Sequence, residues 1–383
     1  MPCGDSSNIN GTGATGLTGD GVFCLETEGD DANACGGTSE AASATTLTLN
    51  QAGNSTFDGV FAGLGALDKT GAGTLTLTDA QTFVGGLTVS EGGIVTGTDT
   101  VPDPDTFGLF ADTLAVTVKS GAQLDVNTAD TFGSLTNEGT VNVNAKQVVD
   151  TVMTSGGTLN LNADFETRST FTVEDDGTDT GTVNINGDST ITAGAGLAGD
   201  GENVGGDGHN FTLAQQDGSI STFRGTIRSD ATPDTSRFTL DGGGTLVLAG
   251  ATDQISVSEL YIVDGRVNLD GSELLQDDIA VTVQTDGALG LTNDQDGTTV
   301  RQESIHSLAG NGEIYLGRNT LNVENGGSFE GEFFGTGSVN VENGTFTINN
   351  SLTSSQGTLT VSNADGTSVS HGTEVAVSSV EVM

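Results

Sequence analysis

Tryptophan is absent from this chain of 383 residues, which has only two tyrosines, three histidines, three cysteines and four prolines. None of His209, His306 and His371 lies in a nucleophile motif, and carbohydrate platforms built on tryptophan are excluded. No apolar run is long enough to cross a membrane as a helix. The first residues are polar and carry no apolar leader, so we expect that any export signal has been removed. The composition therefore predicts a protein that is not an enzyme.

Basic residues are also scarce: ten Lys and Arg stand against 52 Asp and Glu, a formal net charge of −42. They are scattered singly between Lys69 and Arg318, so no basic patch forms. Nucleic acid, anionic lipid and polyanionic glycans are repelled by such a surface, and no nucleic-acid partner is predicted. We interpret the acidic coat as a solubilising cover for strand edges. Divalent-cation binding and adaptation to saline habitats remain alternatives.

All three cysteines, Cys3, Cys24 and Cys35, lie within the first 35 residues. Three pairings are possible, and one thiol must remain. The clustering favours a disulfide that staples a small N-terminal segment in an oxidising compartment, with a zinc site as the alternative. We therefore separate a cysteine-containing cap, residues 1–45, from the rest of the chain, residues 46–383.

Glycine, by contrast, is abundant, with 59 residues, and it begins a repeated pattern Gly-x-Φ-x-Φ, in which Φ is aliphatic or aromatic. The pattern returns about every 20 residues, a period typical of solenoids. Its copies begin at Gly73, Gly139, Gly157, Gly181, Gly244, Gly265, Gly312, Gly337 and Gly357. Alternation of period two indicates a strand with one buried face, and a strand this short needs stacked neighbours to bury it. The sequence thus predicts an all-β solenoid of roughly 15 coils, about 70 Å long at the usual strand spacing.

The repeat is interrupted in two places, residues 97–112 and 194–237. Because regular coils are scaffold, we expect long loops there, and these loops are candidate contact regions. The Phe residues are interpreted as core residues or as stacks inside the coils.

One segment matches a metal-binding pattern. Residues 292–303 read TNDQDGTTVRQE and place Asp294, Asp296 and Glu303 at positions three, five and twelve of an EF-hand loop. These three are candidate calcium ligands, although position one is Thr292 and the flanks read as strands. A polar turn between coils is the alternative. No other cofactor is predicted.

Residues 57–94, FDGVFAGLGALDKTGAGTLTLTDAQTFVGGLTVSEGGI, closely resemble the autotransporter-associated β-strand repeat. The family pattern is KxGxGxLxLxGxxxxxGxxxVxxG, and Asp79 departs from it where a glycine is usual. Degraded copies follow from Gly242 and from Ser307. The marked positions are occupied by Lys69, Gly71, Gly73, Leu75, Leu77, Gly85 or Gly86, Val89 and Gly92.

The resemblance implies the passenger of a type V secretion system, folded as a right-handed parallel β-helix on a bacterial cell surface or outside the cell. An outer-membrane β-barrel translocator is its implied partner. We expect a non-catalytic stalk or adhesin that contacts a cell-surface or matrix ligand in surface attachment, cell–cell contact or biofilm. Self-association into an extracellular filament by end-to-end stacking is the alternative, and a polysaccharide-active β-helix enzyme is a third.

Overall fold

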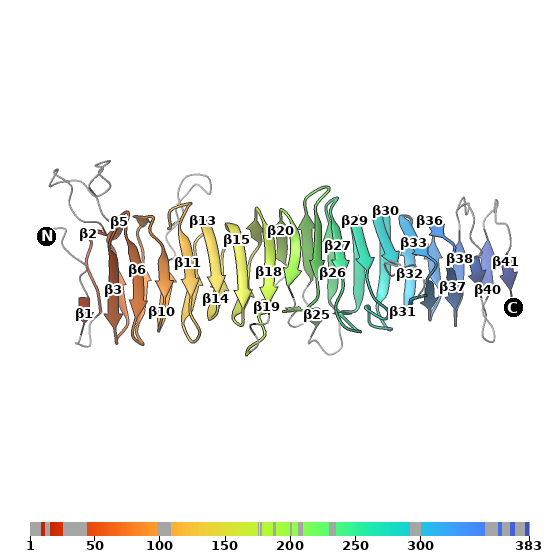
Figure 1. The fold of residues 1–383 in the computed structure, drawn as a ribbon, viewed down its shortest axis with the longest axis horizontal. Coiled ribbons are helices and arrows are strands. Elements are labelled where there is room, and N and C mark those ends of the chain that lie inside the picture. The colour runs from red at the N-terminus through yellow and green to blue at the C-terminus, as the bar shows by residue number, and fades with distance from the viewer. Residues whose placement is uncertain are drawn as a thin grey trace. The chain divides into compact units, whose positions relative to one another are not determined.

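In the computed structural model the chain is a parallel β-solenoid of about 13 turns, in which the described residues contain no helix. It comprises two compact units, residues 1–184 and 185–383. The described residues are 9–11, 16–25, 44–97, 109–174, 176, 178–186, 189–199, 201–205, 210–229, 235–291, 300–348, 359–361, 368–371 and 380–382. Within each unit, strands of successive turns lie side by side (Figure 1).

The strands of the first unit are short, as the repeat predicts. They are β1 (Ile9–Gly11), β2 (Val22–Cys24), β3 (Thr46–Gln51), β4 (Ser55–Phe57), β5 (Val60–Gly63), β6 (Ala66–Thr70), β7 (Thr74–Leu77), β8 (Thr82–Phe83), β9 (Leu87–Val89), β10 (Gly93–Thr96), β11 (Ala115–Val118), β12 (Gln123–Val126), β13 (Asp130–Asn137), β14 (Thr140–Val143), β15 (Gln147–Ser155), β16 (Thr158–Leu161), β17 (Phe165–Thr167), β18 (Thr170–Glu174) and β19 (Thr182–Ile185), whose last residue begins the second unit.

The second unit includes two longer strands, β29 and β30. Its strands are β20 (Ser189–Ala193), β21 (Gly196–Gly199), β22 (Glu202–Gly205), β23 (Phe211–Gln215), β24 (Ile220–Phe223), β25 (Thr226–Ser229), β26 (Arg237–Asp241), β27 (Thr245–Leu248), β28 (Ile255–Ser256), β29 (Glu259–Leu269), β30 (Ala280–Leu291), β31 (Gln302–Ile305), β32 (Ser307–Gly310), β33 (Glu313–Gly317), β34 (Thr320–Val323), β35 (Gly327–Phe329), β36 (Glu332–Gly335), β37 (Ser338–Val341), β38 (Thr345–Ile348), β39 (Leu359–Val361), β40 (Ser368–His371) and β41 (Val380–Val382).

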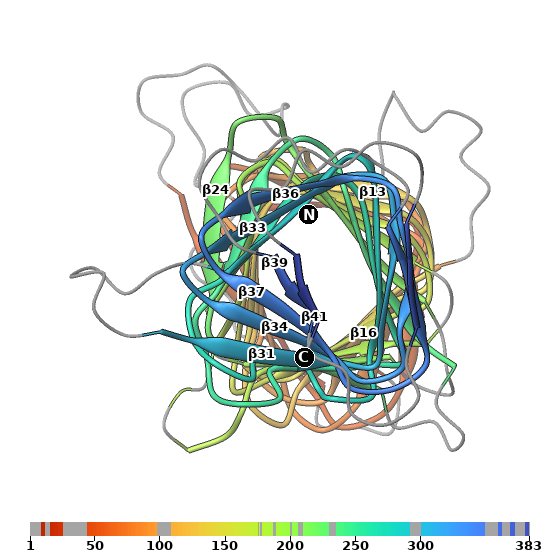
Figure 2. The ribbon, with the colours of Figure 1, turned by 90° about the vertical axis from the view of Figure 1, so that its right-hand side faces the viewer.

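Each unit has several sheet faces, and the strand pairings described for them are parallel. In the first unit β4, β7, β10, β12, β14 and β16 pair in that order along one face, and β2, β5 and β8 along another. In the second unit β27, β29, β30, β33 and β36 pair in order. Strands β31, β34 and β37 form a separate sheet on one side of the coil (Figure 2).

Register places like residues on top of one another. On one face of the first unit the inward residues Leu75, Ile94, Leu124, Val141 and Leu159 are aligned across five successive strands, and all are buried. Outward residues between them are mostly polar, Val95 being an exception, and this is the alternation that the Gly-x-Φ-x-Φ pattern predicts. The predicted all-β parallel solenoid is therefore confirmed.

The number of turns is smaller than the roughly 15 expected because some turns are longer than the repeat of about 20 residues. Asp125 and Asn142, which contact each other across adjacent turns, are 17 residues apart, whereas Thr96 and Asn127 are 31 apart. The longer turn contains residues 98–108, which lie outside the described residues.

The long loop expected at residues 194–237 is wrong, because the described part of this range contains strands β21 to β25. Inward residues continue there, among them Leu213, Phe223 and Ile227. A glycine directly precedes β22 and β25, but not β23 or β24. Of the other expected loop, 97–112, only the ends are described, and Leu109 and Phe110 at its far end are buried.

The described parts of the predicted cap extend the sheets of the first unit. Strand β1 pairs with β3, and β2 pairs with β5. Cys24, at the end of β2, is disulfide-bonded, whereas Cys3 and Cys35 lie outside the described residues.

Candidate functional site

Of the three candidate calcium ligands, only Glu303 lies among the described residues. Its side chain is 1% exposed and accepts hydrogen bonds from the main-chain N–H groups of Leu274 (3.0 Å) and Leu275 (2.5 Å). Burial raises the pKa of Glu303 to about 8, opposed by these two hydrogen bonds and reinforced by Glu273 and Asp277. Within the described residues no group of three or more His, Cys, Asp or Glu is placed to hold a metal ion.

Asp130 is a second buried carboxyl, in the first unit. It accepts hydrogen bonds from the N–H groups of Phe110 (2.9 Å) and Thr131 (2.7 Å). Burial raises its pKa to about 7, against the lowering effect of these hydrogen bonds. Like Glu303, Asp130 accepts a hydrogen bond from the main chain of the preceding turn, so both carboxyls connect one turn of the coil to the next.

Lys69, the first marked residue of the family pattern, is fully buried. Its Nζ donates to the carbonyl oxygens of Thr70 and Gly71, both at 2.9 Å, and lies 3.4 Å from that of Glu91 on the next turn. The Glu91 carboxylate accepts in return from the N–H of Gly71 at 3.0 Å. Burial lowers the pKa of Lys69, opposed by the charges of Glu91 and Asp68. The lysine thus connects two successive turns through hydrogen bonds to their carbonyl oxygens.

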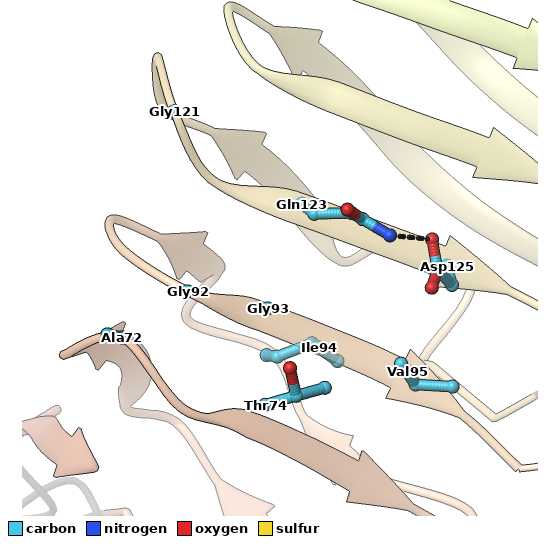
Figure 3. A pocket seen from close by; sticks show the side chains of 9 residues that line it. All are labelled: Ala72, Thr74, Gly92, Gly93, Ile94, Val95, Gly121, Gln123 and Asp125. Atoms are coloured by element: carbon cyan, nitrogen blue, oxygen red, sulfur yellow. Dashed lines mark hydrogen bonds between the residues drawn. The ribbon is translucent and has the colours of Figure 1, made fainter. Parts of the chain in front are cut away.

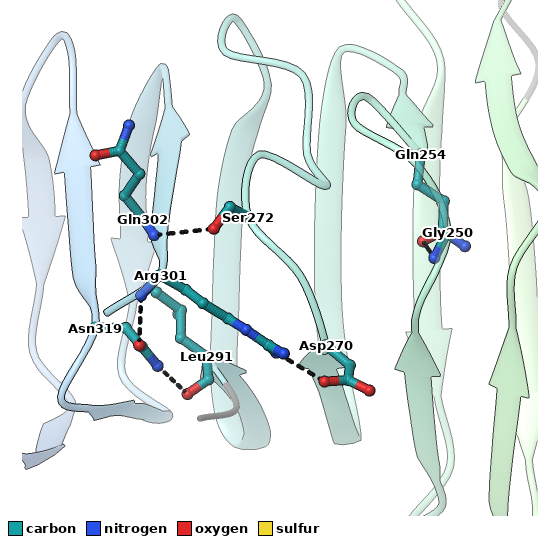
Figure 4. Close-up of polar contacts among 8 residues, drawn as sticks. All are labelled: Gly250, Gln254, Asp270, Ser272, Leu291, Arg301, Gln302 and Asn319. Carbon is teal, nitrogen blue, oxygen red and sulfur yellow. Dashed lines mark hydrogen bonds and ion pairs between the residues drawn. The ribbon is translucent and has the colours of Figure 1, made fainter. Parts of the chain in front are cut away.

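Buried carboxamides hold other corners in the same way. For example, Asn319 donates to the carbonyl of Leu291 at 2.9 Å and accepts from the N–H of Arg301 at 2.9 Å (Figure 4). The Arg301 guanidinium continues to Asp270 at 2.7 Å. Because a buried carbonyl without a donor is costly, these amides stabilise the irregular corners. The buried carboxamides of the described residues are Gln51, Gln81, Asn137, Gln147, Gln215, Gln254 and Asn319.

Outward asparagines form hydrogen-bonded ladders along the turns. In the first unit, Asn184 donates from Nδ2 to Oδ1 of Asn160, Asn160 to Asn142, and Asn142 to Asp125. A second ladder runs from Asn162 through Asn144 to Asn127, and the second unit has a third, from Asn340 through Asn322 to Ser304. In each, the amide donates toward the preceding turn, so the dipoles of one ladder are aligned.

Both tyrosines face outward in the second unit, each beneath an arginine. The guanidinium of Arg237 lies 4.8 Å from the ring centroid of Tyr261, and that of Arg266 lies 4.0 Å from that of Tyr315. Tyr315 in turn stacks on Phe334, with centroids 4.7 Å apart and rings inclined by 17°. Phe334 is thus an exception to the expectation that Phe residues lie inside the coils.

A hollow of about 310 Å³ opens on the outer face of β7, β10 and β12 in the first unit (Figure 3). Strand β10 contributes Gly93, which has Thr74 of β7 on one side and Gln123 of β12 on the other. The residues that line it and carry polar side chains are Thr74, Gln123 and Asp125.

The repeat itself carried a signal for the asparagine ladders, since GTVNV, GTLNL and GTVNI all place Asn at the same position. The buried carboxyls and the hollow have no such signal, because each depends on residues of different turns.

No family model, no curated protein and no solved structure matches this chain. Across the described residues, no helix is long and apolar enough to cross a membrane.

Proposed function

We propose that this chain is a non-catalytic β-solenoid passenger that acts as a structural stalk or adhesin on a bacterial surface or outside the cell. One observation carries the proposal: the buried groups suited to acid–base chemistry, Lys69, Asp130 and Glu303, bond to main-chain atoms of the coil corners. These groups hold the coil together, and most outward positions of the strands are left polar. Such an arrangement suits a scaffold that presents surface.

Export is supported by Cys24. It is disulfide-bonded, and disulfides persist in oxidising environments outside the cytosol. A net charge of −42 suits a protein that stays soluble at high local density and avoids polyanions. The partner in this proposal is a cell-surface or matrix ligand, and secretion through an outer-membrane barrel belongs to the same proposal.

Surface display and attachment test the proposal in the source bacterium. We expect an epitope inserted in the chain to be labelled on intact cells, and a deletion strain to attach less to surfaces or to one another under flow, with recovery on complementation. Labelling only after the cells are lysed, or attachment equal in wild type and deletion strain, would contradict it.

Two measurements on the purified protein separate the alternatives. Single particles in electron micrographs are expected, whereas continuous fibres from dilute solution would favour the filament. Incubation with polysaccharides is expected to release no new reducing or unsaturated ends, and their release would make the protein an enzyme.

A further inference from the structure

The hollow on β7, β10 and β12 exists because one outward column lacks a side chain. At the first outward position of successive strands stand Thr74, Gly93, Gln123, Thr140 and Thr158, aligned by register. Gly93 leaves a gap in this row (Figure 3). All of these residues belong to the first unit.

Backbone geometry does not demand a glycine at this position. The neighbouring Gly92 and Gly121 adopt φ of 66° and 79°, where glycine is favoured, whereas Gly93 lies outside the positive-φ region. A Cβ on Gly93 would lie 3.3 Å from Oγ1 of Thr74 and 3.5 Å from the carbonyl oxygen of Gln123, so a small shift admits it. The missing side chain therefore provides space and is not a requirement of the turn.

Two of the three polar side chains around this space are held in place by hydrogen bonds. Gln123 donates from Nε2 to Oδ1 of Asp125 at 2.8 Å, and Asn142 donates to the same oxygen from the next turn. The hydroxyl of Thr74 lies across the gap. The amide and the carboxylate, together with this hydroxyl, supply both donors and acceptors, which is what adjacent hydroxyl groups of a sugar require. Val95, the next outward residue of β10, adds apolar lining.

Charge and size restrict the occupant. The lining contains no cation, it contains a carboxylate, and the chain carries a net charge of −42, so phosphate, sulfate and uronate groups are repelled. A volume of about 310 Å³ lies at the low end of the range of ligand sites. We propose that this hollow binds one ring of a neutral saccharide, whose adjacent hydroxyl groups form hydrogen bonds with Asp125, Gln123 and Thr74. The inference rests on the proposed adhesive function and names its ligand class.

Binding is tested with the purified full chain, by calorimetry and ligand-observed NMR, against neutral methyl glycosides and their short oligomers, with a uronate oligomer for comparison. We expect binding of at least one neutral glycoside, in the millimolar range typical of a shallow site, and none of the uronate. Gly93→Thr, which places a side chain in the gap of this row and fills the hollow, is expected to weaken binding at least about tenfold. Asp125→Asn, which removes the charge but keeps an acceptor, is expected to weaken it less.

Thr158→Val is the matched control, since Thr158 occupies the same column outside the hollow, and it is expected to leave binding unchanged. Circular dichroism and thermal unfolding verify that each variant folds. The inference is overturned if no neutral glycoside binds, if Gly93→Thr binds like wild type, or if the uronate binds equally well. If cells that display Gly93→Thr still attach, the saccharide site is contradicted and the adhesive function stands. If the wild-type protein is not displayed on the cell surface, the adhesive function itself is contradicted.

Discussion

The guanidinium of Arg266 lies 4.0 Å from the ring centroid of Tyr315, although the two residues belong to turns that are not adjacent. Register pairs Arg266 with Ala288, and Ala288 with Glu313. Between the two lies Gly290, whose ideal Cβ position is only 2.6 Å from the Arg266 side chain. The lack of a side chain on Gly290 lets the arginine cross a whole turn to reach the ring.

Glu313→Gln is expected to lower the pKa of Tyr315. The hydrogen bond from the tyrosine hydroxyl to Glu313 (2.6 Å) is the main cause that raises this pKa, because it stabilises the protonated phenol beside a negative charge. Absorbance titration of tyrosinate in a Tyr261→Phe background isolates Tyr315. Glu332→Gln is the control, since Glu332 contributes least, and an equal fall in both variants would disprove the assignment.

Glu303→Gln is expected to remove a pH dependence of stability in the second unit. Since the folded-state pKa of Glu303 is raised to about 8, its stabilising contribution is complete below its unfolded pKa, near 4.5, and is lost as the pH rises through about 8. As the pH rises across this window, the free energy of unfolding of the wild-type chain should therefore fall relative to that of Glu303→Gln. The expected fall is a few kcal/mol, since a difference of one pKa unit corresponds to about 1.4 kcal/mol.

Urea unfolding at several pH values measures this difference. Asp130→Asn is the comparison in the first unit, where the window ends near pH 7 because the pKa of Asp130 is raised to about 7. A gap between wild type and Glu303→Gln that widens toward acid pH would contradict the prediction.

The direction of the asparagine ladder predicts an asymmetry between two exchanges. Asn160→Asp is expected to destabilise the first unit by about 1–3 kcal/mol, because a carboxylate cannot donate to Asn142 and faces its oxygen. Asp125→Asn should cost little, because Asp125 only accepts from Asn142 and Gln123. Denaturant unfolding of the two variants checks this, and equal losses would show that the ladder has no preferred direction.

Lys69→Met is expected to destabilise the first unit by about 1–3 kcal/mol, since it keeps the buried aliphatic volume and removes the donor to the carbonyl oxygens of Thr70 and Gly71. Lys119→Met is the matched control. The Lys119–Glu138 ion pair is exposed, with side chains 46% and 37% accessible, and its loss should cost less than about 1 kcal/mol. Similar thermal midpoints for the two variants would contradict the role given to Lys69.

How far the sequence predicted the candidate sites depended on the distance between the residues concerned. The outward asparagines belong to the repeat and stand at the same place in each copy, so their ladder could be predicted in principle. Glu303 was linked to Asp294 and Asp296, its neighbours in sequence, whereas its hydrogen-bond partners Leu274 and Leu275 precede it by 29 and 28 residues. No local pattern connects residues so far apart.

The sequence by itself determined the strands of the regular repeat, their buried faces and their parallel stacking. A glycine followed by strict alternation has only one way to bury its apolar side, against copies of itself. The tertiary structure alone decided the length of each turn, the strands within residues 194–237, the residues that hold each corner, and the gap at Gly93. These features arise where one turn meets the next, and contacts between residues 17 to 31 positions apart are set by register.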